Sequence, residues 1–214
     1  GNAVILKPSE YTPRAGAWLR DQLDAELPAG LVGVAQGGGS VGAALLDRVD
    51  AVTFTGSVPT GRKVAMRAAE RLIPCSVELG GNDAAVVLAD CNLDRTVAGV
   101  AQWGLHNCGQ NCAAIERVYV ERSIADEFVR RLGRVADALE VAPHGEHADV
   151  SPVQSHMQLS IVEDHVADAL ERGATLVAGG ERTGTGLGYR PTVLDHCTSE
   201  MKVMSEETFG PVIA

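Results

Sequence analysis

The apolar residues of this chain fall into short runs, separated by longer stretches in which they recur at helical spacing. In the first half, apolar runs bounded by turn residues predict strands, expected at residues 2–7, 31–35, 51–54 and 84–88. The run at 2–7, which ends in Lys7, and the run at 84–88 are expected to be buried strands. Between the strands, helices are predicted at 12–27, 41–46, 57–72 and 93–105. This alternation predicts a parallel sheet with helices on its faces.

The second half continues the α/β pattern with more extended pieces. Strands are predicted at 117–121 and 175–178, and short extended pieces at 189–194 and 202–205. A helix is expected to begin at Ser123, with Asp126 completing a near capping box. A long helix is predicted at 153–172, and surface loops at 143–150 and 181–188. The best division of the chain lies near the Gly80-Gly81 pair.

Composition narrows the class of protein. With 214 residues the chain has room for one large or two small domains, and 45% apolar but only 4% aromatic residues predict an aliphatic core. A net charge of −10 disfavours nucleic acid or an anionic membrane surface as a partner. No apolar run approaches the roughly 20 residues that span a bilayer. Five cysteines without disulfide-style spacing favour a reducing compartment, so a cytoplasmic location is expected.

Two residues are the leading candidates for chemistry. Cys112 ends the stretch HNCGQNC at 106–112, where small and polar neighbours suit a tight loop that presents a thiol. Glu78 lies between Val77 and Leu79, just before a double glycine, so partial burial is expected to raise its pKa and suit it to general-base work. The residues alone leave alternatives open: Glu78 as a strand-end carboxylate in an ion pair, and Cys112 paired with Cys108 under oxidation. A metal site is disfavoured because His106 and these cysteines lack a second ligand pair.

Two glycine-rich stretches are candidates for phosphate binding. The stretch FTGSVPTG at 54–61 places Gly56 and Ser57 where a strand gives way to a helix, whose free N–H groups and dipole suit a pyrophosphate. The alternative is that Ser57 only caps its helix. The stretch GGGSVG at 37–42 matches G-x-G-x-x-G, but it lacks the acidic residue expected on a following strand, so alone it is a weak signal.

The motifs E-L-G-G at Glu78 and G-Q-x-C at Cys112, in this order and about thirty residues apart, resemble those of the aldehyde dehydrogenase superfamily. The resemblance covers essentially the whole chain. It implies an α/β fold: the Rossmann-like, C-terminal part of a dinucleotide-binding domain over residues 1–80, then an α/β catalytic domain over 81–214. It also implies an internal segment of a longer protein, truncated at both ends, with the family's P-W-N motif expected upstream of Gly1.

The resemblance assigns roles residue by residue. It makes Cys112 the nucleophile and Glu78 the general base. It places Lys7 and Glu10 at the adenosine ribose, where a carboxylate favours NAD over NADP because it repels a 2′-phosphate. The remaining expected cofactor contacts are Gly39, Gly56, Ser57, Leu79, Glu207 and Phe209. The last two, in EETFGP at 206–211, are expected at the nicotinamide ribose and ring, against the plainer reading of a helix-start carboxylate and a core aromatic.

The implied function is oxidation of an aldehyde to a carboxylic acid through a thiohemiacetal and a thioester, in a protein that is a homo-oligomer at full length. One alternative is a CoA-acylating semialdehyde dehydrogenase, which Glu78 disfavours because CoA then replaces water. Another is a catalytically silent structural relative. Two departures from the family pattern, residues 91–94 and Glu116 where serine is common, are not expected to touch the chemistry.

Overall fold

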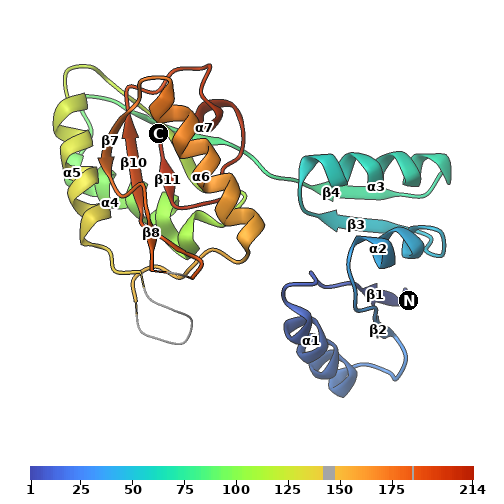
Figure 1. Ribbon diagram of the computed structural model, residues 1–214. Helices are drawn as coiled ribbons and strands as arrows, with labels where there is room; N and C mark the ends of the chain where they lie inside the picture. Colours follow the sequence, from blue (N-terminus) through green and yellow to red (C-terminus); the bar gives the residue numbers. More distant parts are fainter. Residues whose placement is uncertain (142–147, 185) are drawn as a thin grey trace. The chain divides into compact units, whose positions relative to one another are not determined.

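The computed structural model describes residues 1–141, 148–184 and 186–214, which form α/β structure (Figure 1). The chain divides into two compact units, Gly1–Leu79 and Gly80–Ala214. The loops predicted at 143–150 and 181–188 lie in part outside the described residues. Within the described ranges, no helix has both the length and the apolar character needed to cross a bilayer.

The first unit contains two pairs of parallel strands, each strand but the last followed by a helix. In one pair, Leu6 of β1 lies opposite Val34 of β2, and in the other Thr55 of β3 lies opposite Glu78 of β4. The elements in chain order are β1 (Val4–Leu6), α1 (Pro13–Glu26), β2 (Val32–Val34), α2 (Gly39–Leu46), β3 (Val52–Thr55), α3 (Val58–Glu70) and β4 (Cys75–Glu78). The predicted strand–helix alternation is therefore observed.

The second unit is built around strands β6, β11, β10 and β7. Strand β10 pairs with β11 in parallel and with β7 in antiparallel orientation, while hydrogen bonds of Ala214 with Glu116 and Val118 join β11 to β6. The sequence order is β5 (Asp83–Val87), α4 (Leu93–Leu105), the 3-10 helix η1 (His106–Gly109), β6 (Ile115–Val120), α5 (Ala125–Ala138), α6 (His156–Glu171), β7 (Thr175–Ala178), β8 (Arg182–Thr183), β9 (Gly188–Tyr189), β10 (Thr192–Asp195), α7 (Lys202–Ser205) and β11 (Val212–Ile213).

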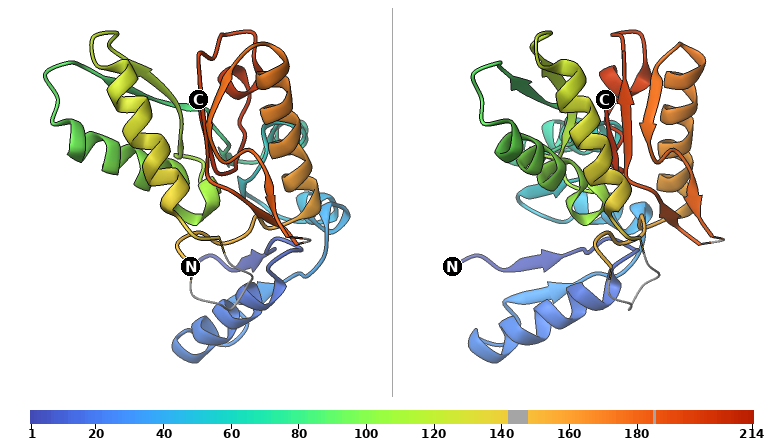
Figure 2. Two further views of the ribbon diagram at one scale, coloured as in Figure 1. Left: turned by 60° about the vertical axis from the view of Figure 1, so that its left-hand side comes forward. Right: turned by 90° about the vertical axis from the view of Figure 1, so that its left-hand side faces the viewer.

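Helices cover both faces of this sheet, α4 and α5 on one side and α6 with α7 on the other (Figures 1 and 2). Successive strand residues point to opposite faces, so each strand serves two cores. Val193 and Ile213 pack with α4 and α5, whereas Leu194 and Val212 pack with α6. The site residues of this unit, Cys112, Glu207 and Phe209, therefore belong to loops of a sheet that is packed on both faces.

Two strands predicted to be buried are largely exposed. Val4 and Ile5 of β1 are 54% and 50% exposed, and Val86 of β5 is 71% exposed. The reason is that β1 and β5 each have a single strand partner among the described residues, β2 and β6 respectively. An apolar run predicts the strand correctly, but its burial depends on what packs on it.

Two local predictions were wrong. Ser123 does not cap a helix: α5 begins at Ala125, and the Ser123 hydroxyl donates to Glu121 instead. Residues 202–205 form the short helix α7 rather than an extended piece, because the Lys202 N–H and ammonium bind Asp168 and Asp164 of α6. In both places side-chain hydrogen bonds decided the local structure.

Candidate active site

Cys112 lies at the tip of a turn formed by residues 111–114. The N–H of Ala114 donates to the carbonyl of Asn111 (3.0 Å), and the N–H of Ala113 donates to the Asn111 side-chain oxygen (3.0 Å). Asn is a preferred residue at the start of such a turn because its side chain can mimic the backbone acceptor. Cys112 is exposed, and its own N–H has no protein acceptor in the described part of the chain. One residue thus offers both a thiol and a free hydrogen-bond donor.

Backbone conformation and one amide side chain hold this turn. Asn107, Cys108 and Gly109 have φ values of 53°, 61° and 67°, a left-handed run that turns the chain directly after α4. The Gln110 side chain accepts from the N–H of Gln154 (2.8 Å) and donates to the carbonyl of Asn107 (3.0 Å). Gln110 therefore supports the cysteine turn from the segment that leads into α6, a role not anticipated from the sequence.

Cys108 contrasts with Cys112. It is fully buried, and burial raises the pKa of its thiol to about 12. A thiol in this environment stays protonated and packs as a small apolar side chain. No cluster of three or more His, Cys, Asp or Glu side chains is placed to hold a metal ion within the residues that the structure describes.

Glu207 and Cys112 both lie next to the Gly80-Gly81 pair. The N–H of Gly81 donates to Glu207 Oε1 (3.2 Å), and a Cβ at Gly80 would come 1.8 Å from Glu207 Oε2. On its other side, a Cβ at Gly81 would lie 3.2 Å from the carbonyl oxygen of Cys112. A side chain at Gly80 would displace the Glu207 carboxylate, and one at Gly81 would force a small shift of its neighbours. The predicted E-L-G-G, G-Q-x-C and E-E-x-F-G-P motifs therefore meet at Gly80 and Gly81.

Glu207 and Phe209 occupy an unusual backbone segment. Burial is the main cause that raises the pKa of Glu207, assisted by the nearby Asp83 carboxylate and opposed by the Gly81 N–H. Phe209 is half-buried and has φ of 47°, which is uncommon for a residue with a side chain. Neither plain alternative holds, because Glu207 follows α7 rather than starting a helix, and Phe209 is not a fully buried core residue.

Glu116 is a site residue that the sequence did not reveal. It is 3% exposed, and its carboxylate accepts from the N–H groups of Thr208 (2.9 Å) and Phe209 (2.8 Å) and from the amide of Asn82 (2.8 Å). It therefore contacts both residues that follow Glu207. The only available signal was a carboxylate inside a strand at a position where the family commonly has serine.

Glu78 ends β4 in the first unit. It lies opposite Thr55, and its carbonyl accepts from the N–H of Gly56 (3.1 Å), so the predicted base and the predicted phosphate loop share one end of the β3–β4 pair. The expected partial burial is wrong: Glu78 is exposed, as is every residue of β4, which has β3 as its one strand partner in the described chain. The alternative of an ion pair is not observed either, because no basic side chain of the first unit is paired with Glu78 among the described residues.

The start of α3 has no side-chain cap within the described part of the chain. Ser57 occupies the position before the helix, but its hydroxyl donates to the hydroxyl of Thr60 (3.1 Å) and does not cap a helix N–H. Leu79 packs against the first turn, since a Cβ at Gly61 would come 2.3 Å from its side chain. A helix start whose N–H groups are not capped suits a phosphate group.

Lys7 and Glu10 meet the glycine loop after β2. The Lys7 ammonium donates to the carbonyl of Gly37 (2.8 Å) and lies 3.9 Å from the Glu10 carboxylate. A Cβ at Gly38 would lie 3.6 Å from that same carboxylate, whereas a Cβ at Gly39 would meet nothing within 4 Å. The loop thus presents an open backbone beside one cation and one anion. Both segments follow the carboxyl ends of parallel strands, where ligands bind in open α/β sheets.

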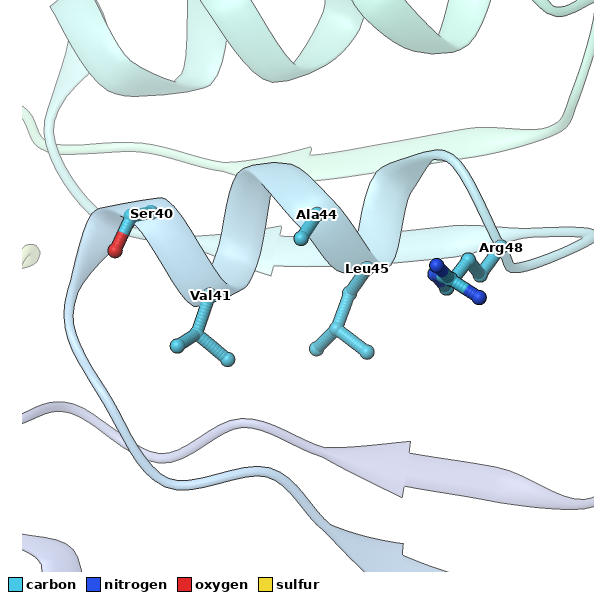
Figure 3. A pocket seen from close by; sticks show the side chains of 5 residues that line it. All are labelled: Ser40, Val41, Ala44, Leu45 and Arg48. Atoms are coloured by element: carbon cyan, nitrogen blue, oxygen red, sulfur yellow. The ribbon is translucent and has the colours of Figure 1, made fainter.

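An open hollow of about 340 Å³ lies along α2. Figure 3 shows the side chains of Val41 and Leu45 pointing from the same face of the helix, with Ser40 and Arg48 near its two ends. The lining is mainly apolar and is completed by Ala44. Such a surface suits a flat apolar ring with polar groups at its edge.

Comparisons with known proteins agree with these motifs. The chain is 42% identical to a Mycobacterium ulcerans protein named "Putative succinate-semialdehyde dehydrogenase [NADP(+)] 2", and the match covers 100% of this chain and 42% of that protein. It is 39% identical to a 2-hydroxymuconic semialdehyde dehydrogenase of Pseudomonas putida, over 99% of this chain and 46% of that protein. The chain thus spans less than half the length of these curated relatives.

Solved structures give the same answer for the fold. An NAD-dependent aldehyde dehydrogenase from Sinorhizobium meliloti superposes with a TM-score of 0.94 at 35% identity, over 99% of this chain and 43% of that one. The sequence model of the aldehyde dehydrogenase family matches residues 1–214. The chain therefore belongs to the aldehyde dehydrogenase family.

Proposed function

We propose that the full-length protein oxidises an aldehyde to a carboxylic acid, with Cys112 as the nucleophile and NAD as the hydride acceptor. The observation that carries this proposal is the exposed Cys112 at a turn tip, beside Gly81 and the Glu207 carboxylate. The family membership and the relatives' names support the reaction class.

In the first step the Cys112 thiolate attacks the aldehyde carbon and forms a C–S bond. The carbonyl electron pair moves to oxygen, and the free N–H of Cys112 is available to stabilise this oxyanion. The buried Cys108 cannot replace Cys112 as the nucleophile, because the Cys108 thiol is inaccessible and burial raises its pKa to about 12. The product of this step is a thiohemiacetal on Cys112.

The second half of the reaction forms a thioester and hydrolyses it, which regenerates the free Cys112 thiol. A bound nicotinamide cofactor would supply the hydride acceptor for the thiohemiacetal carbon, and loss of that hydride would leave a thioester on Cys112. Glu78 then removes a proton from water, whose oxygen attacks the thioester, breaks the C–S bond and releases the acid. The exposure of Glu78 leaves its carboxylate free to take that proton.

The first unit fits a dinucleotide. The uncapped start of α3, with Gly56 and Ser57, suits the pyrophosphate, with Leu79 packed beside it. The open backbone at Gly39, next to the glycines that Lys7 and Glu10 approach, suits the adenosine ribose. In the second unit, Glu207 and Phe209 would hold the nicotinamide ribose and ring. Glu10 would repel a 2′-phosphate, so we expect NAD to be preferred, although one relative is named for NADP(+).

Semialdehydes are the first substrates to test, because two relatives carry that word in their names. We also propose a homo-oligomer and a cytoplasmic location for the full-length protein. The second of these is supported by the five cysteines, all of which are free.

The direct test is rapid-mixing measurement of NADH formation by the full-length protein with NAD and a panel of aldehydes. Cys112→Ala should abolish the burst and lower turnover by about 10³-fold or more, because no other group can form the thioester. Cys75→Ala is the matched control, since Cys75 is also exposed but lies at the start of β4 opposite Val52, whereas Glu78 lies at the other end of the strand. Full activity in Cys112→Ala would refute the proposal.

A further inference from the structure

The segment that carries Glu207 is fixed at its next residue. Thr208 is buried, and all of its polar groups are bonded: its N–H to Glu116 (2.9 Å), its carbonyl to the Gln158 amide (2.8 Å) and its hydroxyl to His165 Nδ1 (3.1 Å). The first bond comes from β6 and the other two from α6. Thr208 therefore ties the segment 206–210 to both elements.

The Glu116 carboxylate binds donors from three different residues. Its Oε1 accepts from the Phe209 N–H (2.8 Å), and its Oε2 accepts from the Thr208 N–H (2.9 Å) and from Asn82 Nδ2 (2.8 Å). Every partner is a donor, so two carboxylate oxygens that only accept match the position better than an amide. Burial raises the pKa of Glu116, whereas the hydrogen bonds from Thr208, Phe209 and Asn82 oppose that shift and favour the ionised form. The same Asn82 nitrogen lies 2.9 Å from the Glu206 carbonyl, which extends the network to the residue before Glu207.

The network holds the backbone in a conformation it would not otherwise prefer. Phe209 has φ of 47°, a left-handed conformation that a residue with a side chain rarely adopts unless its surroundings impose it. The bond from its N–H to Glu116 is one such constraint. Two residues before Phe209, Glu207 accepts from the Gly81 N–H (3.2 Å), directly beside the cysteine turn.

We propose that Glu116 is a positioning residue, whose buried carboxylate fixes Thr208 and Phe209 and thereby aims Glu207 at the nicotinamide ribose. Glu116 itself contacts neither substrate nor cofactor and acts through Glu207 and Phe209. The inference rests on the proposed function, because it takes Glu207 as a cofactor ligand.

A double-mutant cycle on the full-length protein tests this role. The variants are Glu116→Gln, Glu207→Gln and both together, and the measured quantity is the Kd for NAD. Glu116→Gln puts an amide donor against donors, so we expect NAD binding to weaken about tenfold. The double variant should bind NAD no more weakly than Glu207→Gln alone, because Glu116 acts through that carboxylate. Glu171→Gln, the same change at the exposed end of α6, should leave Kd unchanged.

Hydrogen exchange supplies a readout that needs no cofactor. In Glu116→Gln the amides of residues 206–210 should exchange faster, while those of β10 keep their protection and show that the unit is folded. Additive losses in the cycle, or an unchanged Kd in Glu116→Gln, would overturn the proposal. If the wild-type protein does not bind NAD, the proposed function fails, and unchanged exchange at 206–210 would then refute the positioning role as well.

Discussion

The two compact units support their candidate residues in different ways. In Gly1–Leu79 the buried apolar side chains are Leu46, Val64 and Ala68, and the residues of interest are exposed groups and open backbone at the ends of strands. In Gly80–Ala214 two apolar clusters pack on both faces of a sheet, and buried polar groups such as Glu116 and His165 hold the site segment. We infer that changes near the site cost stability in the second unit, whereas in the first they mainly affect binding.

The largest effect is expected where two backbones touch in the second unit. Gly109 has φ of 67°, and a Cβ there would come 1.9 Å from the carbonyl oxygen of Gly210. Gly109→Ala should therefore lower the free energy of unfolding by about 3 kcal/mol or more, as measured by chemical denaturation.

Gly99→Ala is the matched control for this change. Gly99 lies within α4, and a Cβ there meets nothing within 4 Å, so alanine should stabilise the helix by up to about 1 kcal/mol. Equal effects of the two substitutions would contradict the close contact between Gly109 and Gly210.

A smaller effect is expected from pH through His165. Burial lowers the pKa of His165, although the Glu206, Asp164 and Asp168 carboxylates oppose this and Lys202 adds to it. Below the ordinary value of 6.5 the unfolded chain binds a proton that the folded chain does not, so stability falls as the pH falls through that window.

His165→Gln separates this titration from the hydrogen bond. Glutamine cannot titrate but can still bond to the Thr208 hydroxyl, so the wild-type protein should lose more unfolding free energy than the variant on acidification below pH 6.5. Parallel stability curves for the two proteins would show that His165 is not the group responsible.

The smallest change in stability is expected at the open start of α2 in the first unit. A Cβ at Gly39 meets no protein atom within 4 Å, so Gly39→Ala should shift the unfolding free energy by less than about 1 kcal/mol. The added methyl group would occupy space that we assign to the cofactor, so the KM for NAD should rise several-fold. A stability loss as large as that of Gly109→Ala would remove the contrast between the two units.

The sequence predicted the elements better than their burial. Helix 93–105 matches α4 at both ends, because Asn92 caps it and its apolar spacing is regular. Nothing local could show that Val4 and Val86 would be exposed, since burial depends on neighbours that are distant in the chain. Residues 202–205 were misread for a related reason, because their helix is held by aspartates of α6.

The same limit applies to the site. Cys112, Glu78 and Glu207 belong to motifs that are continuous in the sequence, so they could be proposed from the sequence alone. Glu116 could not, because its partners Asn82, Thr208 and Phe209 come from distant positions and meet only in the folded chain. A support residue of this kind carries no motif of its own.

The central claim is that Cys112 carries the acyl group and Glu78 releases it. The most direct measurement is the peptide mass of the Glu78→Gln variant of the full-length protein, acid-quenched after mixing with NAD and an aldehyde. We expect an acyl group to accumulate on the peptide that contains Cys112, because thioester formation continues while hydrolysis is slowed. NADH formation with the acyl group on another cysteine, or with Cys112 unmodified throughout, would contradict this account.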